Sequence, residues 1–231
     1  MTSTTRKTDE NKVKAQAPGK RTANRRPDAK QVRSRRTRDD LMLAGLRLVE
    51  TRDFDQISIA DLVAEAGSSI GSFYHHFADK DDYLNAILDL VVEGLWVEID
   101  RAFDDAAVAA FSTPALLRRA VGFIRDVTRN RQGLVRATLK KSMSNPVAWI
   151  PVRAFARSYE DRIGALLAAR SGDISHEAGW ERGFRQGMQM VYGTLFAAIV
   201  NRPGPMYLED DAMVDELTNM LVRYLGVRKD G

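Results

Sequence analysis

The sequence contains no cysteine, so disulfide bonds, thiolate metal sites and cysteine nucleophiles are excluded. It has three histidines among 231 residues, too few to favour a structural zinc site. No apolar run approaches the roughly 18 residues of a membrane-spanning helix, and the polar N-terminus lacks the apolar region of a signal peptide. Phosphate-loop, nucleophile-elbow and Glu/His metal motifs are also missing. We therefore expect a cytoplasmic protein that is not an enzyme and has no catalytic residue, metal or other cofactor.

Basic residues are concentrated at one end of the chain. Residues 1–40 hold thirteen Lys and Arg against five Asp and Glu, whereas the remainder holds 22 against 26. This asymmetry favours contact of the basic end with a polyanion, and a merely solubilising tail is the alternative. Residues 1–32 contain no Ile, Leu, Phe, Trp or Tyr. Such a segment cannot bury enough apolar surface to fold, so we predict a disordered basic tail over residues 1–32.

From residue 33 onward, apolar residues recur at the spacing of amphipathic helices. Proline and glycine breaks divide the pattern into successive segments, and no strand pattern or internal repeat is found. The sequence therefore predicts an all-α fold of about nine helices.

Residues 57–84 contain three helix starts in close succession. Ser58 and Asp61 form a capping box, and Gly67 suits the left-handed end of the helix that follows. After a turn of about three residues, Ser69 can cap a second short helix over about 70–77, and Asp79 starts a third. This spacing is typical of the helix-turn-helix, which places its second helix in the major groove of DNA. A plain helical hairpin with a polar turn is the alternative.

The small and polar residues of the second helix suit such a contact. Gly71 and Ser72 allow the backbone to approach base edges, which a serine hydroxyl can contact. Donors placed to reach the flanking phosphates are Tyr74, His75 and Lys80. The helix N-termini near Ser58 and Asp79 are expected to offer unpaired backbone N–H groups to the same phosphates.

A family resemblance covers about fifty residues that include the first helix. Phe54, Ser58, Ala66-Gly67 and Ser69 are followed by Gly71-Ser72-Phe73-Tyr74, His75, His76-Phe77 and Lys80. This run resembles the DNA-binding domain of the TetR family of bacterial transcriptional regulators. The resemblance implies that Ser69, Ile70 and Ser72 face bases, and that Ser58, Tyr74, His75 and Lys80 face phosphates.

Arginines gather at the start of the first helix, close enough to that site to reach a phosphate or a minor groove. Arg36 is our candidate among Arg33, Arg35, Arg36 and Arg38, and a solvated helix start is the alternative.

The resemblance also implies a division of the chain into three parts. The tail of residues 1–32 precedes a helix-turn-helix domain of residues 33–83, and residues 84–231 form a helical domain that binds an effector and dimerises. The family pairs through its last two helices, expected here at about 175–201 and 209–225. Gly179, Gly183 and Gly187 recur every fourth residue and indicate tight helix packing, either inside the subunit or, as we favour, across the dimer.

Aromatic residues of the larger part supply the candidates for an effector pocket. We expect its wall to contain Phe123, Trp149, Phe155, Tyr159 and Phe184, with Tyr159 as polar anchor. Such a pocket would suit an aromatic or lipophilic small molecule. At helical spacing these residues can equally be plain core.

The combined interpretation is a homodimeric repressor that a small-molecule effector releases from a palindromic double-stranded DNA operator, with no membrane partner. Two other interpretations stay open. One is a helical ligand-binding protein or enzyme with a vestigial helix-turn-helix, and the other is a protein that coats DNA without sequence preference.

Overall fold

A computed structural model describes residues 29–176 and 179–228, together with Met1. All regular secondary structure in these residues is helical, which confirms the all-α fold class. The elements are α1 (Ala29–Thr51), η1 (Phe54–Gln56), α2 (Ile59–Glu65), α3 (Ile70–His76), α4 (Lys80–Ala102), α5 (Asp105–Val108), α6 (Thr113–Asn130), α7 (Gln132–Ser144), η2 (Pro146–Trp149), α8 (Ile150–Ala168), η3 (Ser171–Asp173), α9 (Trp180–Asn201) and α10 (Asp211–Tyr224), where η marks a 3-10 helix. Nine of these described α-helices are longer than four residues, as expected.

Most of the predicted tail, residues 2–28, lies outside the described residues. Helix α1 begins at Ala29, so residues 29–32, which we assigned to the disordered tail, are helical.

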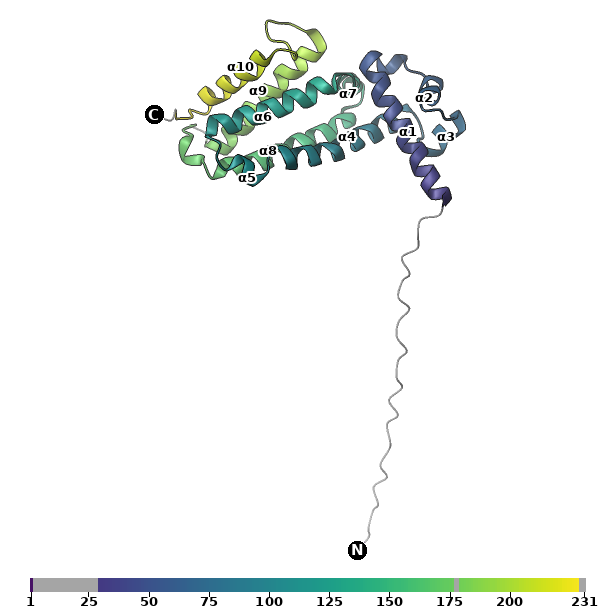
Figure 1. Cartoon of the computed structure of the whole chain (residues 1–231), viewed down its shortest axis with the longest axis horizontal. Helices are drawn as coiled ribbons and strands as arrows, with labels where there is room; N and C mark the ends of the chain where they lie inside the picture. The colour runs from purple at the N-terminus through teal and green to yellow at the C-terminus, as the bar shows by residue number, and fades with distance from the viewer. Residues whose placement is uncertain (2–28, 177–178, 229–231) are drawn as a thin grey trace.

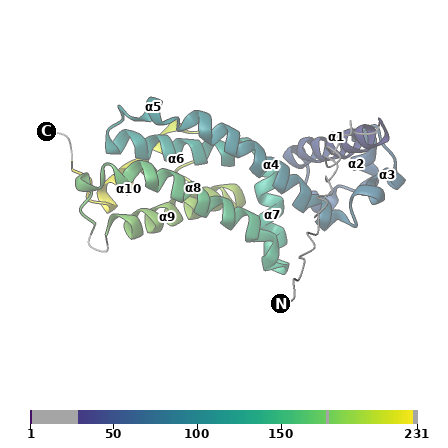
Figure 2. The same ribbon diagram turned by 90° about the horizontal axis from the view of Figure 1, so that it is seen from below.

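Two hydrophobic cores organise the chain (Figures 1 and 2). The first lies among α1, α2, α3 and the first half of α4, and its centre includes Leu41 and Phe73. The second lies among the second half of α4 and helices α6, α8, α9 and α10. Helix α4 supplies Ile87 to the first core and Ile99 to the second. This single uninterrupted helix of 23 residues therefore connects the two parts of the molecule.

Helix α7 follows α6 in the larger bundle but packs against the smaller unit (Figure 2). Its Leu134 and Ala137 belong to the first core. Gly133 lies so close to α1 that a Cβ atom there would overlap the carbonyl oxygen of Val49. Helix α7 is thus a second connection between the two parts, beside α4.

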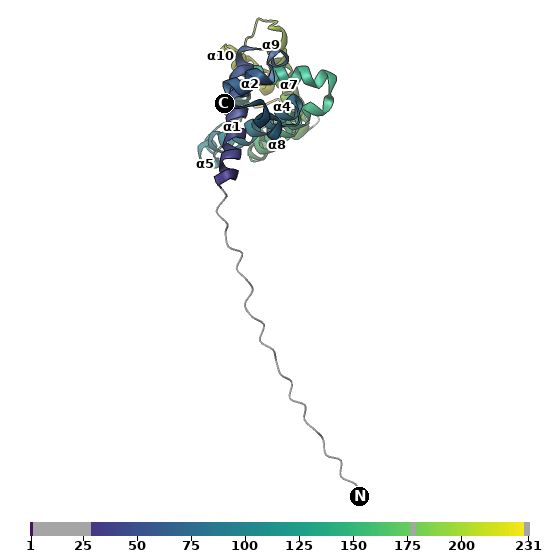
Figure 3. The ribbon, with the colours of Figure 1, turned by 90° about the vertical axis from the view of Figure 1, so that its right-hand side faces the viewer.

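Helices α6, α8, α9 and α10 form the larger bundle, in which α6 packs against both α8 and α10 (Figure 1). Helices α1–α3 lie at one end of this bundle, and they stand in front of it when the molecule is seen from that end (Figure 3). Within the described ranges, no helix has the length and apolarity needed to cross a membrane.

Two of the regularly spaced glycines of α9 pack inside the subunit. A Cβ on Gly183 would come within 2.6 Å of the His176 ring, and one on Gly187 would overlap Leu221 of α10. Our preference for a dimer contact at these two positions is therefore wrong, because intrachain neighbours fill the space beside them.

Candidate functional site

The α2–turn–α3 segment is built by local capping interactions. The Ser58 hydroxyl accepts a hydrogen bond from the Asp61 backbone N–H, and the Asp61 carboxylate accepts one from the Ser58 backbone N–H at 2.7 Å. Gly67, at φ of 59°, ends α2, and Ser69 caps α3 by accepting from the Ser72 N–H at 3.1 Å. These contacts join residues no more than three positions apart, so the sequence pattern alone sufficed to predict them.

The inner face of α3 is held in the first core. Phe73 is fully buried, and its ring lies 5.4 Å from that of Phe77 and 5.3 Å from that of Tyr83. The Tyr83 hydroxyl donates to the Leu41 carbonyl at 2.6 Å, which ties α4 to α1 behind α3. Burial raises the pKa of the Tyr83 hydroxyl, so it stays a donor at neutral pH. This packing orients the opposite face of α3 toward solvent.

The outer face of α3 brings together most of the residues expected to contact DNA. Ile70 and Tyr74 are 52% and 56% exposed, an unusual exposure for such large apolar side chains on a folded domain. Ser69 and His75 are also exposed, and Ser72 is half-buried beside them. The remaining α3 residue on this side, Gly71, has open space where a Cβ would stand, with the Ser69 hydroxyl nearest at 3.9 Å.

The serine hydroxyls of this surface already have partners. The Ser69 and Ser72 hydroxyls lie 3.0 Å apart, and Ser58 donates its hydroxyl hydrogen to Asp61 at 2.7 Å. Bonds from the Ser58 backbone and side chain, with a further one from Arg52, lower the pKa of Asp61 to about 2. A contact of Ser58 with phosphate would have to exchange its bond to Asp61, so Ser58 stays a prediction with a competing partner.

Lys80 is turned toward the protein. Its ammonium group donates to the Phe54 carbonyl at 2.8 Å and lies 4.6 Å above the centre of the Phe54 ring. Partial burial lowers the pKa of Lys80. An ammonium group has three N–H donors, so this bond leaves two for a phosphate. The phosphate contact of Lys80 stays a prediction.

The start of α4 differs from our expectation. Asp79 Oδ1 accepts from the backbone N–H groups of Asp81 and Asp82, each at 2.8 Å. These two N–H groups are therefore not available to phosphate, and three carboxylates surround this helix N-terminus. The expectation of unpaired N–H groups at α4 therefore fails for Asp81 and Asp82, because the aspartate that marks the helix start accepts from both.

The first three turns of α1 contribute no buried residue and carry the predicted arginines. The Arg36 side chain is 85% exposed and lies 3.9 Å from Asp40. Arg38, which we did not single out, stands 5.5 Å above the centre of the Phe77 ring, just after α3. This contact places the basic end of α1 beside the end of α3.

The aromatic residues proposed for an effector pocket are mostly core. Tyr159 is fully buried, donates to the Ala120 carbonyl at 2.9 Å, and stacks on Phe123 and Phe155 at ring distances of 5.6 and 6.2 Å. Phe184 is 1% exposed in the same core. Burial raises the pKa of Tyr159 well above its ordinary value. The structure thus brings these four together as packing rather than around the expected apolar cavity.

Trp149 lies elsewhere. It packs edge-on against Phe196 of α9 at 5.3 Å and does not join the Tyr159 cluster. A pocket wall that contains both Trp149 and Tyr159 therefore has no support from their packing, and the role of Trp149 stays a prediction.

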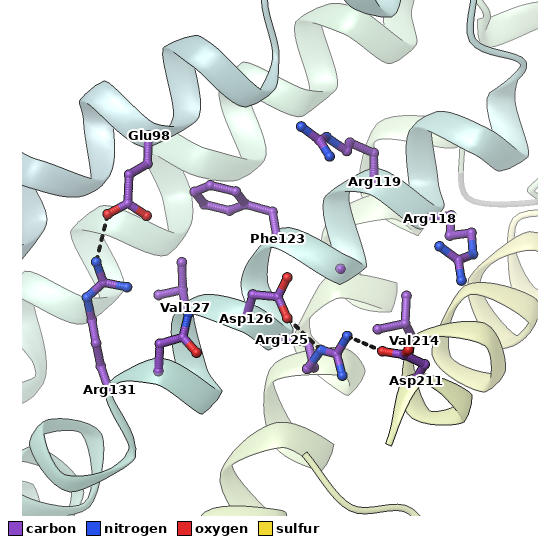
Figure 4. A pocket seen from close by; sticks show the side chains of 12 residues that line it. Glu98, Arg118, Arg119, Phe123, Arg125, Asp126, Val127, Arg131, Asp211 and Val214 are labelled. Carbon is purple, nitrogen blue, oxygen red and sulfur yellow. Dashed lines mark hydrogen bonds and ion pairs between the residues drawn. The ribbon is translucent and has the colours of Figure 1, made fainter. Parts of the chain in front are cut away.

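A cleft of about 420 Å³ lies instead beside α6, with walls from α4 and α10 (Figure 4). Of the five predicted pocket residues, only Phe123 lines it. Its other walls are strongly charged, with four arginines (Arg118, Arg119, Arg125, Arg131) and three carboxylates (Glu98, Asp126, Asp211). Sequence analysis missed this cleft, although the α6 segment carries four arginines.

Ion pairs join the walls of the cleft (Figure 4). Arg131 donates to Glu98 of α4 at 2.7 Å. Arg125, which is 7% exposed, contacts Asp126 and Asp211, each at 2.9 Å. The charged side chains therefore tie α6 to both α4 and α10.

Comparison with known proteins identifies the N-terminal segment. A family model described as "Bacterial regulatory proteins, tetR family" matches residues 41–87, which run from α1 into α4. The uncharacterized HTH-type transcriptional regulator YwcC of Bacillus subtilis is 37% identical over 59 residues, 26% of this chain and 26% of that protein. The HTH-type transcriptional regulator EthR of Mycolicibacterium smegmatis is 27% identical over 107 residues, 46% of this chain and 48% of that protein. The chain thus spans about a quarter and about half of these curated relatives.

Solved structures resemble the chain over most of its length. A bacterial regulatory protein of the tetR family from Rhodococcus superposes with a TM-score of 0.63, covering 84% of this chain and 98% of that one at 15% identity. The Salmonella enterica protein GusR superposes with a TM-score of 0.58, covering 82% and 95% at 16% identity. At these identities the likeness establishes the shared fold.

Proposed function

We propose that the chain is a DNA-binding transcriptional repressor of the tetR family, because the family model matches its N-terminal domain and solved structures of that family share its fold. It acts as a homodimer on a near-palindromic operator and leaves the operator when a small molecule binds the larger domain. In a dimer, two copies of α3 would enter the major groove about one helical turn apart, or a multiple of that spacing.

The outer face of α3 carries this proposal. Ile70 and Tyr74 stand exposed beside the open position at Gly71, on a helix whose inner face is fully packed. These exposed side chains do not stabilise the folded monomer, because apolar groups stabilise a fold when they are buried. In the major groove, Ile70 could make apolar contacts with base edges and with the thymine methyl group.

Substitution at Gly71 tests the proposal without disturbing the monomer. Gly71→Leu should fold normally, since the added side chain meets open space, but should weaken binding to operator fragments selected by the wild-type protein about ten-fold or more. Fluorescence anisotropy on operator and random DNA, at fixed salt, measures both affinities.

Gly94→Leu is the matched control, because Gly94 also lies inside a helix with nothing near its Cβ position, on the distant middle of α4. Wild-type operator affinity in Gly71→Leu would contradict the placement of α3 in the groove. Equal affinity of the wild-type protein for operator and random DNA would instead favour the DNA-coating interpretation.

An outward stripe on α9 supports the dimer. Met190 and Val200 are 42% and 57% exposed, and Gly193 stands between them with nothing within 4 Å of its Cβ position. Ala197 completes the stripe at helical spacing. Apolar and small residues in this order would let a second copy of α9 approach closely.

Gly193→Leu should therefore dissociate the dimer while the subunit keeps its fold. Two bulky side chains, one from each copy, would hold the helices apart and cost about 2 kcal/mol or more, which is about a 30-fold weaker dimer. Analytical ultracentrifugation measures the dissociation constant, and operator affinity should fall with it. A Gly193→Leu protein as dimeric as the Gly94→Leu control would rule out this stripe as the interface.

A further inference from the structure

We propose that the cleft between α4, α6 and α10 binds a small organic monocarboxylate with a flat apolar group, held by Arg119 at the carboxylate and by Phe123 at the ring. The proposal names the class of effector for the function proposed above. It narrows the aromatic or lipophilic small molecule expected from the sequence to a carboxylate.

The size and composition of the cleft suit such a ligand. Its volume of about 420 Å³ falls within the usual range of roughly 300–1,000 Å³ for small-molecule sites. Four arginines against three carboxylates leave a formal charge of +1 on its walls. One negative charge on a ligand balances this excess, whereas a dianion such as phosphate would over-compensate it.

Arg119 is the arginine that can supply this charge. Arg118 pairs with Asp215 at 2.7 Å, Arg125 with Asp126 and Asp211, and Arg131 with Glu98. Arg119 has no carboxylate partner among the described residues, where its one hydrogen bond runs from Nε to the Ala102 carbonyl, at 3.3 Å. Its two terminal nitrogens form the fork that binds a carboxylate in bidentate geometry.

Phe123 supplies the apolar part of the site. It follows Arg119 by four residues on α6, so the two side chains lie on one face of the helix. Figure 4 shows the Phe123 ring between Arg119 and Glu98. Tyr159 stacks on Phe123 from the core at 5.6 Å with an interplanar angle of 16°, which fixes the ring in place. A flat ligand group can lie against this fixed ring while its carboxylate reaches Arg119.

Arg131 connects the cleft to the smaller unit. It stands between the last residue of α6 and the first of α7, and it donates to Glu98 of α4 at 2.7 Å. Two residues later, Gly133 packs on the backbone of α1. A negative charge bound at Arg119, on the same cleft wall, would also attract Arg131 and weaken its pair with Glu98, which would loosen the junction of α4 and α7, the two connections to α1–α3. If the proposed repressor function holds, the ligand lowers operator affinity by this route.

Calorimetric titration of the full chain with benzoate, phenylacetate and 2-naphthoate tests the site directly. At least one should bind saturably, whereas benzyl alcohol and inorganic phosphate should not. Arg119→Gln should weaken that binding about ten-fold or more, because a charge-assisted pair is lost. Arg153→Gln, at an exposed arginine of α8 outside the cleft, should leave it unchanged.

Glu98→Gln should change the affinity for the carboxylate in the opposite direction to Arg119→Gln. It removes one negative charge from the wall and releases Arg131, so carboxylate binding should tighten by about three-fold or more. A misfolded variant cannot produce tighter binding.

Three results would overturn the proposal: no saturable binding of any of the three carboxylates, equal binding by Arg119→Gln, or equal binding of phosphate. These titrations contain no DNA. Failure of the protein to recognise an operator would therefore refute the repressor function and leave the result on the cleft standing.

Discussion

Replacing Gly133 with alanine should destabilise the protein by about 2 kcal/mol or more and weaken the attachment of α7 to α1. The reason is steric. A Cβ atom at this position would overlap the carbonyl group of Val49, and its next contact is the Glu50 backbone nitrogen at 2.9 Å. These are backbone atoms inside α1, which cannot rotate away as the end of a flexible side chain could. The helices must separate, and Leu134 and Ala137 would be drawn out of the first core.

Urea unfolding measures this effect, and Gly122→Ala is its control. A Cβ at Gly122 meets Val214 at 3.7 Å, an ordinary contact, so that variant should gain up to about 1 kcal/mol from helix propensity. If Gly133→Ala were as stable as Gly122→Ala, the close contact between α7 and α1 would be absent in solution. Because α7 is one of two connections to α1–α3, we also expect Gly133→Ala to reduce operator affinity.

Replacing Arg125 with methionine should cost about 3–5 kcal/mol. The guanidinium group is 7% exposed and donates to the Leu208 carbonyl at 3.2 Å, the Asp210 carbonyl at 3.3 Å and Asp211 at 2.9 Å. It thereby ties the α9–α10 loop and the start of α10 to α6. Methionine fills similar space but offers no donor, so the Leu208 and Asp210 carbonyls lose their hydrogen bonds to Arg125, while Asp126 keeps its ion pair with Arg129 at 3.4 Å.

Arg118→Met is the matched control for Arg125→Met. Arg118 is also on α6 and also pairs with an aspartate of α10, Asp215 at 2.7 Å, but its side chain is 55% exposed. Solvent screens such a pair, so its loss should cost less than about 1 kcal/mol. Equal effects of the two substitutions on urea unfolding would show that the burial of Arg125 does not decide its contribution.

The pH dependence of unfolding provides a second measurement. The hydrogen bond and charge of Arg125 lower the pKa of Asp211 below its ordinary value of 3.8. A carboxylate with a lowered pKa in the folded state contributes stability above its unfolded pKa and loses it as the pH falls through its folded pKa. The wild-type protein should therefore lose this contribution below about pH 4, and Arg125→Met should show a flatter profile there.

The helix-turn-helix was predictable because its signals are local. Ser58, Asp61 and Ser69 cap their helices through partners within three residues, and Gly67 ends α2 by its own backbone conformation. The same locality explains the confirmed all-α fold, since helical periodicity and caps are properties of short segments. The outward placement of Tyr74 was expected from that spacing, and that of Ile70 was implied by the family resemblance.

The roles of individual residues in the larger part were less predictable from the sequence. Spacing alone cannot distinguish an aromatic residue that lines a cavity from one that fills a core, and Phe155 and Tyr159 proved to be core. Gly183 was interpreted as a contact between subunits because the sequence does not show that the His176 ring lies against it. The arginines of the cleft were overlooked because two of their partners, Glu98 and Asp211, lie about 30 and 90 positions away from Arg131 and Arg125.

For this protein, the sequence by itself determined the helical class, the capped helix-turn-helix and the face of α3 that meets solvent. These follow from hydrogen bonds and periodicity over a few neighbouring residues, which the chain carries wherever it packs. Only the tertiary structure decided that α7 joins the first core, that Tyr159 is closed to ligands, and that Arg119 stands without a carboxylate partner among the described residues. Each of these depends on which distant segments meet, and the packing of whole helices decides that.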